Sequence, residues 1–343
     1  MKAIVIHAPG DLRVDQVAAP TPGPGEVQVQ IGAGGICGSD LHYYHNGGFG
    51  DVRLKEPMIL GHEIAGTVVD VGPGVSSVRP GDKVAVNPSL ACGTCAYCQA
   101  GLQNHCTDMH FYGSAMRFPH VQGAFRELLV CKEAQAVAVP SHVSLDEAAF
   151  AEPFAVALHA VSRAGPLVGK TVLVTGSGPI GVLIVAAARL AGAGTIVVSD
   201  ILDEPLAFAI AMGADTVVNT GKQPDGLAGY ESGKGTFDAV FEASGSGAAV
   251  IQALRVLRPR GALVCVGQGG QANLAMSAVV TREIELRGAF RFHTEFRTAV
   301  DFIAGGRVAL RPLLTAAMPA DDAKDAFDLA SDKSRSMKVQ LRF

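Results

Sequence analysis

Four cysteines stand close together in the first half of the chain, in a Cys-x2-Cys-x2-Cys-x7-Cys pattern. They are Cys92, Cys95, Cys98 and Cys106. Thiolates at such spacings can wrap one tetrahedral ion, and four sulfur ligands leave no coordination position open for chemistry. The pattern therefore predicts a structural zinc loop over residues 87–110, with an iron–sulfur cluster as the alternative. A nucleic-acid-binding zinc module is not expected, because residues 84–116 contain no Lys or Arg.

A second group of potential metal ligands is dispersed along the chain. Cys37 follows an expected strand, the pair His62 and Glu63 follows a glycine, and Glu152 opens an expected helix. Taken singly, His62 reads as a core histidine and Glu152 as a charge at a helix amino terminus. Together they offer a thiolate, an imidazole and two carboxylates. A catalytic zinc needs three protein ligands and one open position, and this set predicts such a site.

A glycine-rich loop follows the strand-forming run Thr171–Thr175 in the pattern G-x-G-x-x-G. Its glycines allow a tight turn, a close approach of a pyrophosphate and close packing of the following helix, whose free N–H groups favour negative charge. A bare glycine pattern would be weak evidence, but here the flanking strand and helix are in place. The loop residues expected at a dinucleotide are Gly176, Gly178, Pro179, Ile180 and Gly181.

The next expected strand ends in Asp200, close to the spacing of about 20 residues at which an acidic residue binds the adenosine ribose. Its carboxylate would accept hydrogen bonds from both ribose hydroxyls and would repel a 2′-phosphate. No Lys or Arg occurs in residues 201–203. The sequence therefore predicts NAD, with NADP less favoured. The alternative is that Asp200 only caps the next helix.

Short strands separated by turns fill residues 1 to about 150, as in a small barrel or sandwich. The clearest are Val27–Ile31, Thr67–Val71 and Lys83–Val86. From residue 151 the pattern changes to apolar strands that alternate with helices, which predicts an α/β fold with a doubly wound parallel sheet buried on both faces. The expected helices are 151–164, 180–191, 204–212, 248–257 and 294–304, and the expected strands are 171–175, 195–199, 216–218, 237–242, 262–266 and 338–342.

The terminal strand has no place in a completed doubly wound sheet, so the tail is expected to return to the first domain. This gives a catalytic domain of residues 1–150 and 294–343 and a dinucleotide-binding domain of residues 151–293. A length of 343 residues suits two domains.

Composition narrows the range of partners and compartments. The formal net charge is −4, so no electrostatic attraction to nucleic acid or to an anionic membrane is expected. The longest uncharged apolar stretch, Thr171–Ala188, holds the glycine-rich loop and so reads as strand, turn and helix, not as a membrane span. The amino end has too short an apolar run for a secretory signal. Seven cysteines, an odd count, favour metal ligands or free thiols in a cytoplasmic protein.

Taken together, these motifs resemble the zinc-dependent medium-chain dehydrogenases over essentially the whole chain. The resemblance rests on Cys37-x-Ser39-x-x-His42, on the His-Glu pair, and on the cysteine and glycine-rich loops. Glu152 stands where alcohol dehydrogenases carry a cysteine ligand, which is typical of the polyol, sorbitol dehydrogenase-like branch. The resemblance implies a GroES-like β domain with a catalytic cleft and a Rossmann domain.

The same resemblance implies a mechanism. Zinc at Cys37, at His62 and at either Glu63 or Glu152 would bind the substrate hydroxyl and lower its pKa, and hydride would pass to the nicotinamide. Ser39 would pass the hydroxyl proton outward, with His42 at the end of the relay. Two zinc ions per chain are implied, one catalytic and one structural.

The resemblance also implies contacts with the nicotinamide and with the substrate, on less specific sequence patterns. On the nicotinamide side they are Ser244, Gly245, Val266, Gly267, Phe290 and Arg291, for each of which an ordinary turn is the alternative. A substrate carboxylate would meet a cation, for which the candidates are Arg117, His110, His120 and Arg291. Tyr43 and Tyr44 are candidates for binding sugar hydroxyls, or else for the core.

The expected substrate is a secondary alcohol of a sugar acid or polyol. Several segments resemble the branch members that oxidise L-idonate to 5-ketogluconate; they are residues 87–89, 106–109, 113–116, 118–121, 290–292 and 338–341. The alternatives are a sorbitol, xylitol or L-threonine dehydrogenase and a non-catalytic relative. The resemblance also implies a homo-oligomer, a tetramer or dimer, joined through an edge strand at Ala289–Phe292.

Overall fold

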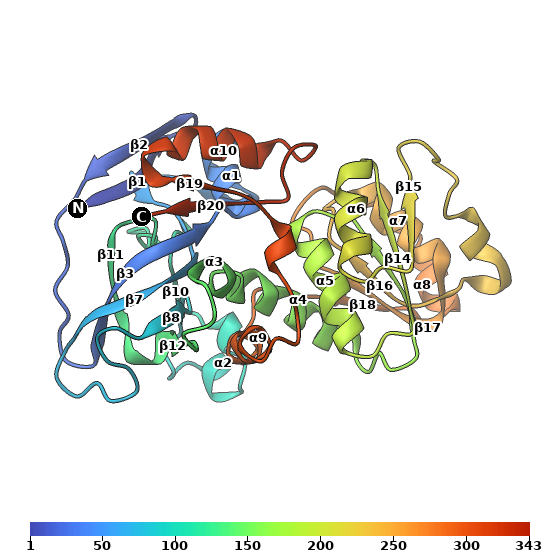
Figure 1. Ribbon diagram of the computed structural model, residues 1–343. Coiled ribbons are helices and arrows are strands. Elements are labelled where there is room, and N and C mark those ends of the chain that lie inside the picture. Colours follow the sequence, from blue (N-terminus) through green and yellow to red (C-terminus); the bar gives the residue numbers. More distant parts are fainter. The chain divides into compact units, whose positions relative to one another are not determined.

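The structure is a computed structural model that describes all of residues 1–343. The chain folds into two units (Figure 1). The first unit comprises Met1–Glu152, Phe296–Asp332 and Lys338–Phe343, and the second comprises Pro153–Glu295 and Lys333–Met337.

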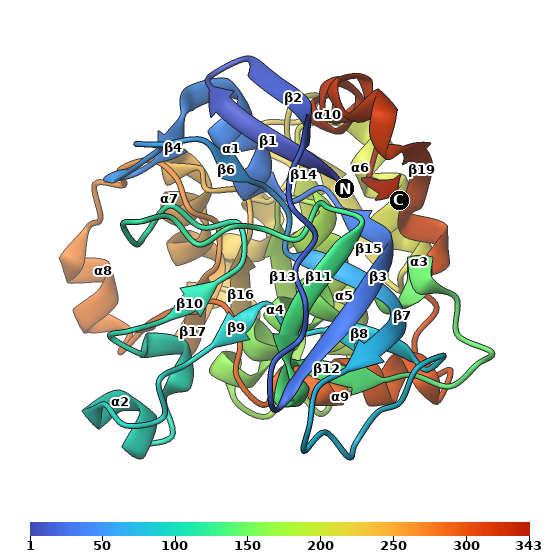
Figure 2. The same ribbon diagram turned by 90° about the vertical axis from the view of Figure 1, so that its left-hand side faces the viewer.

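A seven-stranded sheet organises the first unit (Figure 2). Its order is β12-β8-β7-β3-β20-β19, and β11 also pairs with β3. Adjacent strands are antiparallel except for β19 and β20, which are parallel. The strands are β3 (Glu26–Gly35), β7 (Glu63–Val71), β8 (Lys83–Val86), β11 (Leu128–Lys132), β12 (Ala136–Ala138), β19 (Leu314–Pro319) and β20 (Lys338–Arg342). The tail strand β20 pairs with β3 and so lies in the first unit, to which the tail was expected to return.

Side-chain alternation explains the packing of this sheet. Val27, Val29 and Ile31 on β3 are buried, while Gln30 between them faces solvent. Successive side chains of a strand point to opposite faces, so one face joins the core. That core also receives Phe125.

Smaller elements complete the first unit. The strands are β1 (Lys2–Ala8), β2 (Asp11–Gln16), β4 (Gly48–Phe49), β5 (Val52–Arg53), β6 (Met58–Ile59), β9 (Ser89–Leu90) and β10 (His110–Phe111). The helices are α1 (Gly38–Asn46), α2 (Ala96–Gln99), α3 (Leu145–Ala148), α9 (Glu295–Ala304) and α10 (Ala323–Ser331). Short 3-10 turns are η1 (Gln103–His105), η2 (Glu133–Gln135), η4 (Arg311–Leu313) and η5 (Ala320–Asp322).

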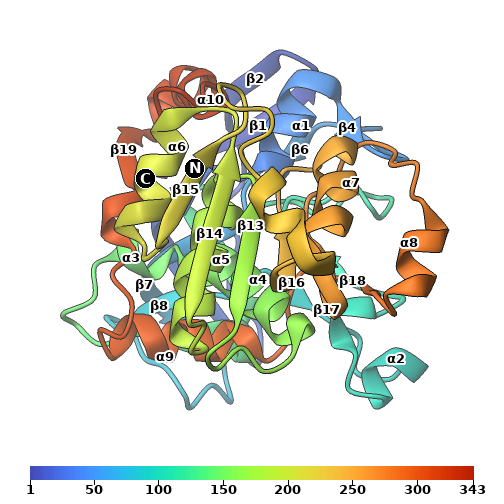
Figure 3. The same ribbon diagram turned by 90° about the vertical axis from the view of Figure 1, so that its right-hand side faces the viewer.

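The second unit is a six-stranded sheet in which every strand pair is parallel (Figure 3). Its order, β15-β14-β13-β16-β17-β18, is the doubly wound order 3-2-1-4-5-6 of dinucleotide-binding folds. The strands are β13 (Thr171–Thr175), β14 (Thr195–Asp200), β15 (Thr216–Asn219), β16 (Phe237–Glu242), β17 (Leu257–Cys265) and β18 (Glu285–Gly288). The connecting elements are α4 (Ala151–Ala164), α5 (Pro179–Leu190), α6 (Asp203–Ala211), η3 (Ala228–Lys234), α7 (Gly247–Val256) and α8 (Met276–Thr281).

Most expected elements occur within a residue or two of their expected bounds. In the first unit, however, β3 runs on to Gly35 and β7 begins at Glu63, each four residues beyond its expected bound, and further exceptions lie late in the second unit. The strand expected at 262–266 begins earlier, at Leu257. The edge strand expected at Ala289–Phe292 is wrong, because the outermost strand β18 ends at Gly288. Arg291 has a positive φ of 54°, a left-handed conformation that does not continue a strand. None of the helices combines the length and the apolarity that crossing a bilayer requires.

Candidate functional site

The four-cysteine loop is held at its base by a short hairpin. Strands β9 and β10 pair antiparallel, with Phe111 opposite Ser89. Between them the four sulfur atoms all lie within 4.8 Å of one another. Cys92 Sγ lies 4.0 Å from Cys98 Sγ, and Cys95 Sγ lies 4.0 Å from Cys106 Sγ. Zinc–sulfur bonds of about 2.3 Å place tetrahedral sulfurs about 3.8 Å apart, so the sulfurs fit one zinc ion.

Backbone N–H groups point at these sulfurs. The Cys92 and Asp108 amides donate to Cys106 Sγ at 3.2 and 3.3 Å, and the Cys95 amide donates to Cys92 Sγ at 3.4 Å. Donors of this kind favour thiolate over thiol, and the amide of Cys98 is the main cause that lowers the pKa of Cys95 to about 5, whereas burial raises the pKa of Cys98 itself to about 12. The loop is therefore prepared for a cation and not for disulfides, and all its cysteines are unpaired.

The dispersed ligands meet where β3 and β7 pair. Gly35 at the end of β3 lies opposite Glu63 at the start of β7. A Cβ on Gly35 would lie 2.1 Å from Glu63 Oε2, so only glycine allows the carboxylate this position. Two residues later, Cys37 caps the amino terminus of α1. One ligand atom each from Cys37, His62 and Glu63 lies within 4.8 Å of the others, as the sequence predicts.

Asp40 ties the two segments of this cluster together, a role that sequence reasoning missed. Its side chain is fully buried and accepts hydrogen bonds from the Cys37 amide at 3.0 Å and from the Gly61 amide at 3.2 Å. His62 Nδ1 lies 3.8 Å from Asp40 Oδ1 and has no hydrogen-bond partner. The Phe111 ring packs against the His62 imidazole with 5.3 Å between centroids. The imidazole is thus held between an aromatic ring and a buried carboxylate.

Lys338 was also missed as a site residue. Its ammonium donates to both carboxylate oxygens of Glu63, at 2.8 and 2.6 Å, and to the Ile36 carbonyl at 3.1 Å. Burial alone would lower the pKa of Lys338, but Glu63 outweighs burial and the pKa is raised. In the sequence, Lys338 and Gln340 alternate with Val339 and Leu341, which normally indicates one solvated face of a strand. Here that face is covered, and Lys338 is 3% exposed.

Glu152, in the first turn of α4, lies beside this cluster as a further buried carboxyl group. Burial, opposed by His62 and reinforced by Glu63, raises the pKa of Glu152 to about 8. Burial and Glu63 likewise raise the pKa of Cys37 to about 12. Glu152 is not in the set of mutually close ligand atoms. Buried charges need partners, and a cluster of thiol, imidazole and carboxylates with one lysine fits a divalent cation such as zinc.

The proposed relay residues share one helix. Ser39 and His42 lie three residues apart on α1 and so on the same side of the helix. Ser39 is half-buried and His42 is exposed, with its ring 5.8 Å from that of Phe49.

Several candidates for substrate contacts are occupied by other bonds. His120 is buried, its Nε2 accepts from the Lys55 amide at 2.8 Å, and its Nδ1 lies 2.8 Å from the Arg117 carbonyl. An imidazole that accepts a hydrogen bond at one nitrogen and donates one at the other is neutral. The prediction that His120 could bind a substrate carboxylate as a cation is therefore wrong. Arg117 instead pairs with Asp108 and lies 2.8 Å from His110 Nε2.

The two tyrosines are also engaged. The Tyr43 hydroxyl accepts from the Ala115 amide at 3.0 Å, and the Tyr44 hydroxyl donates to Asp328 at 2.9 Å. Both rings are buried in the core of the first unit. These contacts support the alternative prediction, in which the two tyrosines are core residues and do not bind the substrate.

In the second unit the glycine-rich loop leads into α5. Gly176 has a φ of +85°, and a Cβ there would lie 2.7 Å from the Ser244 amide nitrogen. A Cβ on Gly181 would lie 1.9 Å from the Gly176 carbonyl oxygen, whereas one on Gly178 would meet nothing within 4 Å. Gly178 caps α5 and Pro179 is its first residue. The open space before a helix amino terminus fits a pyrophosphate.

Asp200 faces this loop. One carboxylate oxygen accepts from the Ser177 amide at 2.6 Å and from the Ser177 hydroxyl at 2.9 Å, and the other accepts from the Ile201 and Leu202 amides. Helix α6 begins only at Asp203. The alternative that Asp200 caps this helix is therefore wrong, because every amide that donates to the Asp200 carboxylate belongs to a residue before Asp203.

Two further loops meet the glycine-rich loop at the carboxyl ends of β16 and β17. The buried Glu242 carboxylate accepts from the Ser244 amide at 2.8 Å and from the Gly245 amide at 3.0 Å, a contact that the sequence did not indicate. The amides of Val266 and Gly267 donate to the Glu242 carbonyl. These residues therefore lie at the edge where open α/β sheets bind ligands. Beyond β18, the Arg291 guanidinium lies over the Phe290 ring.

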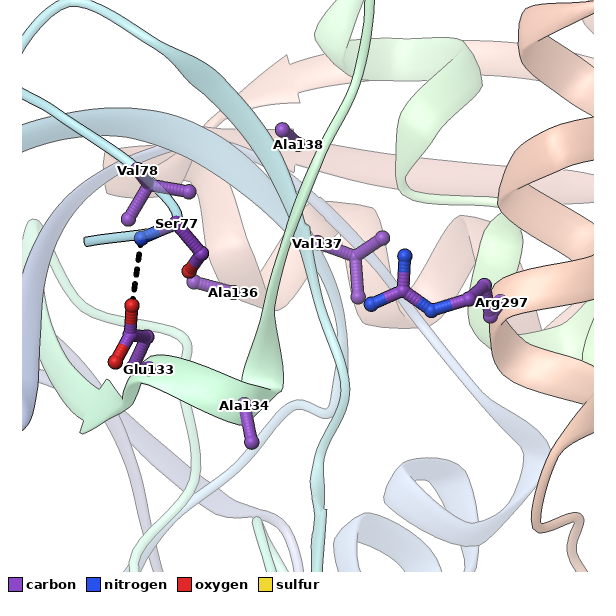
Figure 4. A pocket seen from close by; sticks show the side chains of 8 residues that line it. All are labelled: Ser77, Val78, Glu133, Ala134, Ala136, Val137, Ala138 and Arg297. Carbon is purple, nitrogen blue, oxygen red and sulfur yellow. Dashed lines mark hydrogen bonds between the residues drawn. The ribbon is translucent and has the colours of Figure 1, made fainter. Parts of the chain in front are cut away.

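A separate cavity of about 370 Å³ lies beside the edge strand β12 (Figure 4). Small apolar side chains and polar groups both line it, and Glu133 there accepts from the Ser76 and Ser77 amides. It contains no cysteine or histidine, so it offers none of the chemistry of the two clusters. Its lining residues are Ser77, Val78, Glu133, Ala134, Ala136, Val137, Ala138 and Arg297.

Comparison with known proteins assigns both halves of the chain to families. Residues 23–141 match the alcohol dehydrogenase GroES-like domain, and residues 179–305 match the zinc-binding dehydrogenase family. The L-idonate 5-dehydrogenase (NAD(P)(+)) of Escherichia coli is 46% identical over 92% of this chain and 91% of its own length. A sorbitol dehydrogenase of Bacillus subtilis is 35% identical over 99% of this chain and 97% of its own length.

Solved structures agree with this assignment. The crystal structure of the L-idonate 5-dehydrogenase from Escherichia coli superimposes with a TM-score of 0.96 at 43% identity, covering 100% of this chain and 98% of the other.

Proposed function

The chain belongs to the zinc-binding alcohol dehydrogenases, and on that premise we propose that it oxidises the carbon 5 hydroxyl of L-idonate to 5-ketogluconate, with NAD as the hydride acceptor. The cluster of the half-buried Cys37 with the buried His62 and Glu63 carries the assignment of an alcohol oxidation. The substrate rests on the 46% identity to the L-idonate enzyme of Escherichia coli. The sorbitol dehydrogenase at 35% identity supports polyols as the second candidate substrates.

We propose that Cys37, His62 and Glu63 hold the catalytic zinc, and that the four clustered cysteines hold a structural zinc. When bound, the catalytic ion supplies a Lewis acid that lowers the pKa of a bound alcohol. The choice of Glu63 over Glu152 is supported by its place among the mutually close ligand atoms. Glu152 stays beside the cluster as an additional carboxylate.

The remaining residues of the cluster orient these ligands. Lys338 holds both oxygens of Glu63 and fixes the carboxylate at the end of β7. Asp40 faces His62 Nδ1, so it selects the tautomer in which Nδ1 carries the proton and Nε2 is free to bind metal. Because Asp40 and His62 are both buried, the carboxylate of Asp40 acts on the imidazole N–H with little screening by solvent.

Proton release is assigned to α1. Ser39 accepts the proton of the substrate hydroxyl as it gives its own hydroxyl proton to His42, one turn further along the helix, and His42 releases a proton to solvent. The half-buried position of Ser39 and the exposure of His42 support this direction. An imidazole exchanges protons readily near neutral pH, so it suits the outer end of such a relay.

The dinucleotide is assigned to the second unit. The loop Gly176–Gly181 would bind the pyrophosphate and Asp200 the adenosine ribose. Ser244, Val266 and Gly267, together with Phe290 and Arg291, are assigned to the nicotinamide side. This is supported by their place after β16, β17 and β18.

A substrate panel tests the proposed function. Purified zinc-loaded protein is mixed with NAD and with L-idonate, D-gluconate, D-sorbitol, xylitol or L-threonine, and reduced cofactor is followed by absorbance. We expect kcat/KM to be highest for L-idonate, by about tenfold or more over the polyols, because a site that has evolved to pair a cation such as Arg291 with the substrate carboxylate would reject neutral analogues. A preference for sorbitol or xylitol would support the second candidate, and no turnover of any alcohol would contradict the proposal.

We also propose that the protein acts in the cytoplasm as a homodimer or homotetramer. Seven unpaired cysteines support a reducing compartment. Strand β18 is an unpaired sheet edge, and Met276, Val280 and Leu286 on α8 and β18 expose large apolar side chains. Light scattering after gel filtration checks the oligomer, and a monomer at micromolar concentration would contradict it.

A further inference from the structure

Lys222 is the first basic residue that follows Asp200 in the chain, since residues 201–221 contain no Lys or Arg. It comes three residues after the end of β15, the neighbour of β14 in the sheet. The carboxyl ends of these two strands lie at the same edge, where the adenosine ribose binds in a doubly wound fold. A cation there is the group that would accommodate the 2′-phosphate of NADP.

In the structure this cation is already paired. The Lys222 ammonium donates to one carboxylate oxygen of Asp203, and the Asn219 side-chain amide donates to the other at 2.5 Å. Hydrogen bonding to Lys222 is the main cause that lowers the pKa of Asp203 and, in return, Asp203 raises the pKa of Lys222. Asp203 is only three residues beyond Asp200, so the pair borders the ribose site.

The backbone around the pair is fixed. The Thr220 amide donates to the Asp200 carbonyl at 2.8 Å, which holds the turn after β15 against the end of β14. Asp200 itself is held by the amide and hydroxyl of the buried Ser177. Neither Asp200 nor the turn therefore needs to rearrange before a dinucleotide binds.

The pair itself is accessible. The side chains of Lys222 and Asp203 are 70% and 54% exposed. An exposed ion pair contributes little to folding stability, so breaking it leaves the fold intact. With Asp203 in place, the positive charge of Lys222 is neutralised, and Glu204 adds a further negative charge near Lys222.

We propose that Asp203 is a specificity residue that withholds Lys222 from the 2′-phosphate of NADP. This inference rests on the proposed assignment of the dinucleotide to the second unit. Removing the charge of Asp203 frees Lys222 to bind a phosphate, while Asp200 still binds the ribose of NAD.

The test measures dinucleotide binding, not turnover. NADPH and NADH are titrated by their fluorescence into wild type, Asp203→Asn, Lys222→Met and the double variant. In Asp203→Asn, the side-chain oxygen that accepts the hydrogen bond from the Asn219 amide is kept, so only the charge is removed. We expect Asp203→Asn to tighten NADPH binding by about tenfold, as one charge-assisted hydrogen bond would, and to leave NADH within about twofold. The double variant should lose this gain.

An exposed acid of the same segment serves as the matched control. Asp225→Asn changes the net charge by the same amount without touching Lys222, and it should leave both affinities unchanged. Equal tightening in Asp225→Asn, tightening that persists in the double variant, or no tightening in Asp203→Asn would each overturn the proposal. A wild-type protein that bound neither dinucleotide would contradict the proposed function itself, together with this inference.

Discussion

The two clusters of potential metal ligands in the first unit are built in opposite ways. The four cysteines lie within 15 consecutive residues, and backbone amides of their own loop point at the sulfurs. Cys37, the adjacent pair His62 and Glu63, and the neighbouring Glu152 come from three separate segments, and Lys338 from the end of the chain pairs with Glu63. The first cluster is satisfied locally, whereas the second depends on tertiary packing.

This difference matches the two roles proposed for the clusters. A closed shell of four thiolates stabilises a loop and leaves no place for substrate. The dispersed cluster is buried, acidic and asymmetric, with a lysine and an aspartate that position its ligands. Changes to the dispersed cluster should therefore affect turnover, and changes to the cysteine loop should affect stability.

Cys37→Ala should have the largest effect. Loss of the thiolate removes a ligand of the proposed Lewis acid, which contributes several kcal/mol to the chemical step, so kcat should fall by at least about 10³-fold. NADH affinity should be unchanged, because the dinucleotide is assigned to the other unit. Cys131→Ala is the matched control, since Cys131 is buried in β11 outside both clusters. Comparable turnover in Cys37→Ala and Cys131→Ala would contradict the claim that turnover depends on the dispersed cluster.

Lys338→Met should have the second largest effect, which is on stability. It leaves the buried Glu63 without its counter-ion, which typically costs about 3–5 kcal/mol of unfolding free energy. Urea denaturation of chelator-treated protein measures this loss. Adding Glu63→Gln to Lys338→Met should recover part of it, because the unpaired charge is then gone. A loss below about 1 kcal/mol would show that the pair does not carry the charge balance described above.

Cys95→Ser should mainly lower stability. Removing one thiolate opens the closed shell, so the midpoint of thermal unfolding should fall by about 5 °C or more, given about 2–4 °C per kcal/mol. Turnover per folded molecule should stay within about tenfold of wild type. If turnover instead fell as far as in Cys37→Ala, the proposed division of roles between the clusters would be wrong.

Glu295→Gln should have the smallest effect, in the second unit. Burial alone would raise the pKa of Glu295, but hydrogen bonds from His159 and from the His293 amide lower it to about 2. Because the folded-state pKa is depressed, the stabilisation is complete above about pH 4.5 and is lost as the pH falls toward 2. We expect a loss of about 1–2 kcal/mol at pH 7 after allowing for the partial exposure of the pair.

Chemical denaturation from pH 7 down to pH 3 checks this prediction. The difference between wild type and Glu295→Gln should shrink as the solution becomes more acidic. A difference that stayed constant over this range would show that the effect does not arise from ionisation of Glu295.

Local patterns predicted most of the fold and the cysteine loop. Runs such as Thr171–Thr175 and Phe237–Glu242 are strands with the expected bounds, because buried parallel strands are apolar throughout. The spacing of the four cysteines and of the glycine-rich loop also specified which atoms would meet.

What the sequence did not predict depends on contacts between distant segments. Lys338 looked like a residue on the solvated face of a strand, and only the pairing of β20 with β3 places it beside Glu63. His120 was a candidate cation for a substrate carboxylate, yet both of its ring nitrogens are hydrogen-bonded, one to the Lys55 amide and the other to the Arg117 carbonyl. Asp40, Ser177 and Glu242 likewise act through backbone amides that no spacing rule identifies.

The zinc content of Cys37→Ala and Cys95→Ser tests the central claim most directly. Metal is counted by atomic emission on purified, folded protein. We predict two ions per chain in wild type and one in each variant, with Cys37→Ala inactive while it keeps its structural ion. A Cys37→Ala protein that retained both ions, or lost both together, would contradict the claim that two separate clusters bind zinc for two separate purposes.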